Sequence, residues 1–313
     1  MGHKEKDRQH VRGCKVNATI TDDNCTANIY PTIYMSLIKP KQKDQQLLKD
    51  IRSFDHEVCF KVWWLAQSGF LIKWQTKYLL FDPYLSDSLS VKYQHTEKPH
   101  VRMSERVIDP AELDFLDIVT SSHNHTDHLD AETLIPILEN KKVQFIIPEA
   151  NRDFVVDRIG CETAFPVGLN DGISFEHEGF KITGVPSAHN ELERNEKGEC
   201  RYMGYVVQFG DYSIYHSGDT LLFDGLQEIL KPFQVDIAFL PINGNKPGRK
   251  VAGNLNPEEA AKLAKEIGAK LVIPHHYHLF EFNTADPEDF EAACLKYGVH
   301  YKVLELGEGM VYC

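Results

Sequence analysis

The sequence of 313 residues lacks the features that would place it in a membrane or in a disulfide-rich class. No apolar run approaches membrane-spanning length, the first residues have no apolar signal-peptide core, and no C-x-x-C pair occurs. Seven cysteines are scattered along the chain, and an odd, scattered set favours a reducing compartment over a disulfide framework. We therefore expect a cytoplasmic protein with no membrane insertion.

Positive charge is also scarce in this chain. It carries 34 Lys and Arg residues against 46 Asp and Glu residues, which gives a formal net charge of -12. This balance repels polyanions and leaves no basic stripe, so we expect no nucleic-acid partner. A local basic pocket for a small anionic substrate is compatible with this net charge. The sequence also allows the protein to form a homo-oligomer. The 42% of hydrophobic residues is typical of a globular protein with a sizeable core.

The chain divides into an extension and one domain. Residues 1–55 are polar with mixed charge and read as an N-terminal extension, in which 45–51 is helical and packs on the body. This extension is interpreted either as a cover over the core or as an arm that binds a partner. Residues 56–313 form the domain, in which β-rich and helical segments alternate after an initial β-meander.

The domain is predicted from short apolar segments bounded by turn residues and from helices with clear start and stop signals. Asn256 and Pro257 start one such helix and Gly268 ends it. We expect strands at 60–67, 69–74, 78–81, 116–121, 143–147, 173–175, 180–185, 205–209, 212–215, 235–240, 271–274, 301–306 and 310–312, and helices at 131–138, 150–159, 223–230, 257–267 and 287–297.

Metal-ligating residue types crowd the loop that follows the predicted strand at 116–121. His123 and His125 alternate and can aim at one point, while Asp127 and His128 turn toward a second point nearby. Imidazole and carboxylate groups suit zinc and its neighbours, and no thiol is close in sequence. The loop therefore predicts two adjacent metal sites at the C-terminal end of a strand.

Further ligand candidates stand at the ends of other predicted strands. His189 is the expected third ligand of the first metal, and Asp219 is expected to lie between the two metals. One histidine among His275, His276 and His278 should complete the second metal site, and the spacing alone leaves the choice open.

Two more polar residues at strand ends are not expected to bind a metal themselves. Asp82 forms either a simple turn or a hydrogen bond that orients a metal-ligating histidine, because such imidazoles usually donate their second N–H to a carboxylate. His216 is expected to point back into the sheet.

A long loop rich in amides and cations follows the predicted strand at 235–240. Asn243, Lys246 and Arg249 are the candidates for gripping an anionic substrate, since a guanidinium can make bidentate contacts. The alternative is a solvated basic loop. Arg201 and Tyr202 are candidates for the opposite wall.

The order of these residues, each at a strand end, resembles the metallo-β-lactamase fold. The resemblance implies an αββα sandwich with two metals at one edge, and it covers the chain from about Val58 to its end. The true β-lactamases carry a cysteine ligand where this chain has Asp219, so antibiotic hydrolysis is not expected. By the resemblance, His123, His125 and His189 hold metal one, Asp127, His128 and His276 hold metal two, and Asp219 bridges them.

Shorter motifs point to a subgroup and an activity. Residues 64–70, 82–83, 215–220 and 241–244 resemble the L-ascorbate-6-phosphate lactonase group, which implies hydrolysis of a lactone or ester in a small anionic, sugar-like substrate. Two divalent cations, zinc first and manganese or iron as alternatives, would lower the pKa of a shared water toward about 7. Asp127 or Asp219 would then take up the proton.

Two other functions remain in view. The cluster from Ser122 to Asp130 is also similar to that of N-acylphosphatidylethanolamine phospholipase D, which implies a phosphodiesterase. A non-enzymatic alternative is a metal-bound scaffold whose N-terminal extension recruits a partner.

Overall fold

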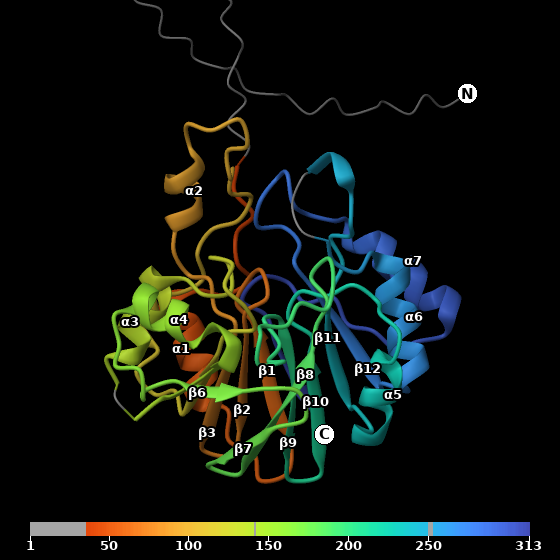
Figure 1. The fold of residues 1–313 in the computed structure, drawn as a ribbon, viewed down its shortest axis with the longest axis horizontal. Coiled ribbons are helices and arrows are strands. Elements are labelled where there is room, and N and C mark those ends of the chain that lie inside the picture. Colours follow the sequence, from red (N-terminus) through yellow and green to blue (C-terminus); the bar gives the residue numbers. More distant parts are fainter. Residues whose placement is uncertain (1–35, 141, 250–252) are drawn as a thin grey trace, which may run out of the picture. The chain divides into compact units, whose positions relative to one another are not determined.

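Two β-sheets pack face to face between two layers of helices (Figure 1). The structure is a computed structural model that describes residues 36–313 except 141 and 250–252. The first sheet has the strand order β13-β1-β2-β3-β4-β5-β6, and the second has the order β12-β11-β10-β9-β8-β7. This is the αββα sandwich that the sequence predicts.

Each sheet combines an antiparallel and a parallel part. In the first sheet β1, β2 and β3 pair antiparallel and β3 to β6 pair parallel, whereas in the second β7 to β10 pair antiparallel and β10 to β12 pair parallel. The strands are β1 (Phe60–Trp64), β2 (Phe70–Trp74), β3 (Lys77–Phe81), β4 (Ile118–Thr120), β5 (Gln144–Pro148), β6 (Val167–Leu169), β7 (Ser174–His177), β8 (Phe180–Pro186), β9 (Met203–Phe209), β10 (Tyr212–His216), β11 (Ile237–Pro241), β12 (Leu271–His275) and β13 (Gly309–Tyr312).

Aromatic side chains fill the space between the sheets. The rings of Phe70 and Phe239 lie 4.3 Å apart between their centroids, and those of Phe60 and Phe209 lie 5.0 Å apart. All four residues are buried. Because such rings bury a large apolar area and favour offset or edge contacts, they hold the two sheets together.

Helices cover the outer faces of both sheets. In Figure 1, α1, α3 and α4 lie beside the first sheet, and α5, α6 and α7 lie beside the second. The predicted N-cap of α6 is present, because Asn256 and Glu259 form a reciprocal capping box and Gly268 ends the helix at φ +70°. The helices are α1 (Asp44–Ser53), α2 (Ser88–Tyr93), α3 (Ala131–Leu138), α4 (Arg152–Ile159), α5 (Leu226–Leu230), α6 (Pro257–Ile267) and α7 (Pro287–Tyr297), with 3-10 turns at Pro110–Glu112, Glu149–Asn151, Lys231–Phe233 and Pro247–Arg249.

Helix α1 packs on the core, as the sequence predicts for 45–51. Leu47, Leu48 and Ile51 are buried, and the side chain of Asp50 accepts hydrogen bonds from β1. Residues 36–55 therefore belong to the same compact unit as the sandwich, which spans Ser36–Cys313. Residues 1–35 of the predicted extension lie outside the described residues.

One predicted strand is wrong, and two elements were not predicted. The segment 301–306 forms only a single bridge, between Tyr301 and Val272 of β12, the end strand of the second sheet. The segment 88–93, for which the sequence analysis gives no element, forms the short helix α2, and the short strand β6 extends the parallel side of the first sheet.

The structure corrects the interpretation of the cysteines. Cys59 and Cys313 form a disulfide, although 254 positions separate them. The antiparallel pairing of β1 with β13 places Phe60 opposite Tyr312 and brings the two thiols together. Sequence spacing holds no trace of this pairing, so the expectation of cysteines without a disulfide is wrong for this pair. None of the helices in the described part of the chain is long and apolar enough to cross a membrane.

Candidate metal centre

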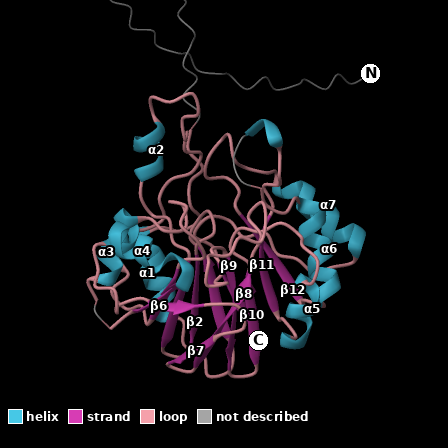
Figure 2. Cartoon of the chain, in the orientation of Figure 1, coloured by secondary structure: helices cyan, strands magenta, loops and turns pink. Residues whose placement is uncertain are grey.

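Loops gather at the edge of the sheets where strands β1, β3, β4, β8, β10 and β12 end (Figure 2). Within each sheet these strands run in the same direction, so their carboxyl ends meet at one edge. All the predicted metal ligands lie just after β4, β8, β10 or β12. The topology therefore brings together side chains that are far apart in the sequence.

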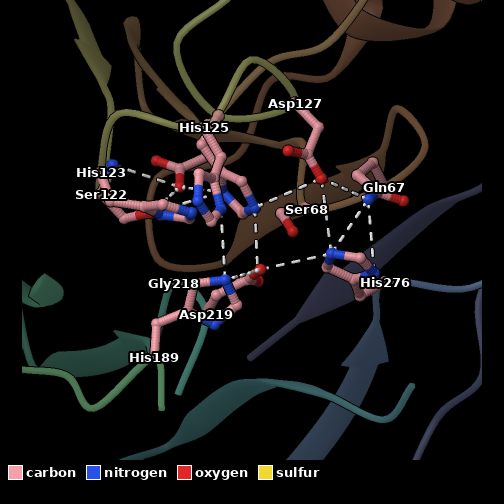
Figure 3. Close-up of polar contacts among 12 residues, drawn as sticks. Gln67, Ser68, Ser122, His123, His125, Asp127, His189, Gly218, Asp219 and His276 are labelled. Atoms are coloured by element: carbon pink, nitrogen blue, oxygen red, sulfur yellow. Dashed lines mark hydrogen bonds and ion pairs between the residues drawn. The ribbon is translucent and has the colours of Figure 1, made fainter. Parts of the chain in front are cut away.

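The first group consists of three histidines. Nitrogen atoms of His123, His125 and His189 lie within 4.8 Å of one another, and Nε2 of His189 is 3.2 Å from Nδ1 of His125 (Figure 3). The Ser122 hydroxyl lies 3.0 Å from Nδ1 of His123, and the Gly253 carbonyl lies 2.9 Å from Nδ1 of His189. These contacts fix the two rings with Nε2 facing the centre.

Asp219 lies between the histidines of the two predicted sites. Its Oδ1 atom is 3.3 Å from Nε2 of His128, and its Oδ2 atom is 3.7 Å from Nε2 of His189 and 3.3 Å from Nε2 of His276. With His123 and His128, it also forms a group of potential ligands. Its side chain therefore lies between the two predicted sites, and the bridging role of Asp219 stays a prediction.

A third group of potential ligands contains Asp127, His128 and His276. Oδ2 of Asp127 is 3.4 Å from Nε2 of His276 and 3.8 Å from Nε2 of His128. The side-chain amide of Gln67 donates a hydrogen bond of 2.7 Å to the same oxygen. The structure thus brings all seven predicted ligand side chains into one cluster.

Asp82 supports this cluster from the end of β3. Its Oδ2 atom lies 2.7 Å from Nδ1 of His128, and its Oδ1 atom accepts a 2.8 Å hydrogen bond from the hydroxyl of Thr120. The hydroxyl of Ser122 donates to the same carboxylate. Of the two readings of Asp82, the structure supports the one in which it orients a histidine.

The three clustered histidines after β12 take different places. His276 joins the centre, whereas the His275 ring stacks on His216 and its Nδ1 lies 3.0 Å from the hydroxyl of Ser68. His278 lies elsewhere, with its backbone N–H bonded to a threonine hydroxyl. His216 is fully buried between the sheets and points back into them, as expected.

Unusual backbone conformations surround the centre. Gln67, Asp82 and His276 all have positive φ angles, of 48°, 36° and 65°. Such angles cost energy for residues with a Cβ atom, and they cluster where a fold holds functional side chains. Gly218, at φ +58°, directly precedes Asp219, and a Cβ there would lie 2.6 Å from the Cβ of Ser122.

The carboxylates and imidazoles of the centre shift one another's pKa values. Burial opposes the charged form of His276, yet the carboxylates of Asp219 and Asp127 raise its pKa to about 9. Burial would raise the pKa of Asp219, but the imidazoles of His276 and His128 hold it well below its usual range. Burial lowers the pKa of His189 to about 4. A divalent cation would replace protons here, because metal ligands must be deprotonated.

Buried polar atoms of the centre have no hydrogen-bond partner among the described residues. They are Nε2 of His123, Nε2 of His128 and Oδ1 of Asp219; the last two approach within 3.3 Å of each other but form no hydrogen bond. Leaving such atoms unpaired is costly, whereas a coordinated cation would satisfy all of them. Imidazole nitrogens and carboxylate oxygens are also the donors that zinc accepts. The residues present therefore fit a metal centre.

The centre forms the floor of a pocket with a volume of about 430 Å³. His125, Asp127, His189, Asp219 and His276 line the floor, and Lys92, Lys98 and Arg158 contribute positive charge to the lining. The remaining wall is mainly aromatic, with Tyr93, His100, Phe280 and Phe282, beside the polar side chains of Asn254 and Asn283.

The predicted substrate loop contacts this pocket indirectly. Asn243 and Arg249 do not belong to the lining; both donate hydrogen bonds to Oδ1 of Asn283, over 2.8 Å and 2.7 Å. This differs from the direct grip that the sequence suggests, because Asn243 is buried behind the lining. Lys246 is exposed and outside the lining.

The predicted opposite wall is also displaced. Arg201 forms an ion pair with Glu193 over 2.9 Å and does not line the pocket. The Tyr202 ring lies 5.4 Å from that of His123 and 5.5 Å from that of His189, measured between centroids, so it packs on these two histidines without joining the lining.

Residues 77–277 match the family described as the beta-lactamase superfamily domain. The chain belongs to the metallo-β-lactamase superfamily. A UPF0173 metal-dependent hydrolase of Methanosarcina mazei is 29% identical to it over 252 residues, which cover 80% of this chain and 96% of that relative. A UPF0173 metal-dependent hydrolase of Pelotomaculum thermopropionicum is 30% identical over 255 residues, which cover 80% of this chain and 99% of that relative.

Solved structures of the superfamily share the fold. Igni18, a metallo hydrolase of Ignicoccus hospitalis, aligns with a TM-score of 0.60 and 21% identity over 82% of this chain and 99% of its own. The metallo-β-lactamase fold protein YhfI of Bacillus subtilis aligns with a TM-score of 0.58 and 19% identity. The alignment covers 81% of this chain and 100% of YhfI.

Two residues on irregular loops, Gln67 and Asn283, belong to the site but were given no role by the sequence analysis. Gln67 contacts both Asp127 and His276, and Asn283 receives two hydrogen bonds at the pocket wall. Gln67 stands in a segment noted for its resemblance, which was a signal for attention but gave no role. Asn283 gave no signal, because it follows no strand and belongs to no motif.

Proposed function

We propose that the protein is a hydrolase that acts with two divalent cations, held by His123, His125, His189, Asp127, His128, His276 and Asp219. Zinc is the first choice, with manganese or iron as alternatives. The observation that carries the proposal is the convergence of these side chains into one cluster with unpaired buried ligand atoms, five members of which line the floor of one pocket. The metal-dependent hydrolases among the relatives support the same reaction class.

A cation pair bound here would supply hydroxide at neutral pH by lowering the pKa of a shared water toward about 7. The chain's own residues position the ligands and manage the proton. Asp82 fixes the ring of His128, and Gln67 fixes the carboxylate of Asp127. Asp127 and Asp219 both line the pocket, so either carboxylate can receive the proton released during hydrolysis.

The substrate that we propose is a small anion with a lactone or ester bond, as in the L-ascorbate-6-phosphate lactonase group. Support comes from Lys92, Lys98 and Arg158, which give the pocket positive side chains in a chain of net charge -12. Cations in a confined pocket attract and orient an anionic substrate. A phosphodiester carries a negative charge too, so phosphodiesterase activity is the second candidate on the same centre.

The decisive experiment combines metal analysis with a substrate panel. Freshly purified protein is expected to contain close to two equivalents of a transition metal, and to open phosphorylated or carboxylated lactones in a pH-stat assay. Bis-p-nitrophenyl phosphate tests the phosphodiesterase alternative in parallel. Asp219→Asn should abolish turnover, whereas Asp224→Asn, outside the pocket lining, should not. Metal-loaded protein that hydrolyses no lactone, ester or phosphodiester would refute the proposal.

A cytoplasmic location and the non-enzymatic scaffold role stay predictions. Deleting residues 1–35 tests the scaffold role, because unchanged hydrolysis with lost association would assign partner binding to that segment.

A further inference from the structure

Asn283 occupies a defined position at the pocket wall. Its Oδ1 atom lies 2.7 Å from Nη1 of Arg249 and 2.8 Å from Nδ2 of Asn243. A guanidinium has donors and no acceptor, so the Asn283 atom that faces it must be the amide oxygen. The orientation of the carboxamide is therefore settled by its neighbours.

The opposite end of this carboxamide is available to a ligand. Within residues 36–313, apart from 141 and 250–252, no hydrogen bond uses Nδ2 of Asn283, although its backbone N–H donates to Phe280 over 3.1 Å. Arg249 and Asn243 lie outside the pocket lining and Asn283 lies within it. The two N–H donors of Nδ2 are thus unused by the described residues, on a side chain that lines the pocket, and they suit an oxygen acceptor on the substrate.

An aromatic wall stands next to Asn283. The His100 ring stacks on Tyr93 with centroids 4.3 Å apart, and Phe282 meets His100 edge-on at 4.6 Å. Burial lowers the pKa of His100, which favours the neutral imidazole, a further flat ring in the wall. These three rings, all in the pocket lining, form an aromatic wall against which a flat apolar group can pack, face-on or edge-on.

The wall is fixed by backbone hydrogen bonds between two segments. Met103 donates to Leu279 over 2.8 Å and Glu281 donates to Val101 over 3.1 Å, which pairs the segment of His100 with that of Phe282. The hydroxyl of Ser90, in α2, also donates to the backbone of His100 over 2.8 Å. A wall fixed in this way loses little entropy when a ligand binds.

We infer that the substrate carries a flat ring with an oxygen acceptor, that the ring packs against the aromatic wall of Tyr93, His100 and Phe282, and that Asn283 donates to the acceptor. This inference rests on the proposed function for the position of the metal end of the pocket. Asn283 and Phe282 then select the substrate, and Arg249 and Asn243 are positioning residues that act through Asn283. A sugar acid, which has no flat ring, should bind more weakly.

Equilibrium binding to the metal-loaded protein tests this without turnover. The probes are acetate, gluconate, benzoate, isophthalate and terephthalate, measured by isothermal titration calorimetry after metal analysis. Benzoate should bind about tenfold more tightly than acetate or gluconate, because only it can stack on the wall. One of the two dicarboxylates should bind a further tenfold to about a hundredfold more tightly, by placing its second carboxylate at Asn283.

Variants separate the two contacts. Phe282→Ala should remove the advantage of benzoate over acetate, whereas Phe233→Ala, a similarly half-buried ring outside the pocket, should retain it. Asn283→Asp keeps the oxygen that faces Arg249 but replaces the N–H donors with an acceptor. It should remove the advantage of the dicarboxylate while the melting temperature stays unchanged.

A double-mutant cycle tests the positioning role. Arg249→Met should weaken dicarboxylate binding in the wild-type background and have no further effect in Asn283→Ala, because the two residues act as a unit.

The outcomes distinguish this inference from the proposed function. Equal affinity for benzoate, gluconate and acetate, or an unchanged dicarboxylate advantage in Asn283→Asp, would overturn the inference even if the protein hydrolyses lactones. The expected ranking in a protein that hydrolyses nothing would support the pocket's ligand class and refute only the hydrolase.

Discussion

The Asp82 carboxylate and Nδ1 of His128 lie 2.7 Å apart, and both side chains are fully buried. This contact turns Nε2 of His128 toward the centre and raises the electron density of the ring. The length of the contact and its burial make Asp82 the main support of one proposed ligand.

Asp82→Asn should therefore weaken metal binding more than it weakens the fold. Asn tolerates the positive φ of this position, but a neutral amide orients the imidazole less firmly. We expect a loss of about tenfold to a hundredfold in metal affinity, measured by competition with a chromogenic chelator. Asp153→Asn, on the exposed side of α4, serves as the control. Equal affinity in both variants would remove Asp82 from the centre's support.

Metal binding should stabilise the protein through His276, and His278 should contribute nothing to this stabilisation. Restoring free zinc to about a thousandfold above its Kd should raise the free energy of unfolding by about 4 kcal/mol relative to the chelated protein. His276→Ala should lose most of this gain, whereas His278→Ala should keep it. The two positions share a positive φ, which makes them a matched pair. Thermal unfolding with and without EDTA gives the measurement, and the reverse ranking would assign the ligand to His278.

Asp50 should make stability depend on pH. Burial opposes its charge, but hydrogen bonds from Lys61, Trp63 and Gln42 hold its pKa below the ordinary value. Because the folded-state pKa is lowered, the stabilisation is present above the unfolded-state pKa of about 3.9 and is lost as pH falls through the folded-state value.

Asp50→Asn should thus lower the free energy of unfolding by about 1 to 2 kcal/mol at pH 7, and the difference should shrink below about pH 4. Asp114→Asn, which removes only an exposed ion pair with Arg52, should cost at most about 0.5 kcal/mol at any pH. Urea titrations at several pH values measure both. A pH-independent difference for Asp50→Asn would contradict the role of its charge.

Gly218→Ala should damage the centre by steric contact. The added Cβ would meet the Cβ of Ser122 at 2.6 Å and the carbonyl oxygen of Met203 at 2.7 Å, one residue before Asp219. Gly160→Ala, at φ +72° with open space around it, carries only the backbone cost of about 1 to 2 kcal/mol. Gly218→Ala should add about 1 to 3 kcal/mol to that cost and also reduce metal affinity. Equal destabilisation in the two variants would show that the contact is relieved.

The loop from His123 to Asp130 could be read from sequence because its physics is local. A short apolar strand delivers the ligands, and Asp130 caps α3 by accepting from the backbone N–H of Thr133, which fixes where the loop ends. His189 and Asp219 followed from the rule that strands running in the same direction end at one edge.

Residues whose roles come from contacts between distant loops could not be read in this way. Asn283 gains its orientation from Arg249 and Asn243, and the aromatic wall forms because the segments around His100 and Phe282 pair. Neither the contacts of Asn283 nor the pairing of these two segments leaves a periodic pattern in the sequence. The strand predicted at 301–306 also depended on contacts between distant segments, because only Tyr301 bridges β12, at Val272, and the rest of the segment forms no strand.

The bond between Cys59 and Cys313 closes nearly the whole sandwich into a covalent ring. A protease that cuts once within any surface loop of this ring leaves the fragments linked, so two cuts are needed before a piece can leave. Limited digestion should therefore yield one band on a gel without reductant and separate fragments with it.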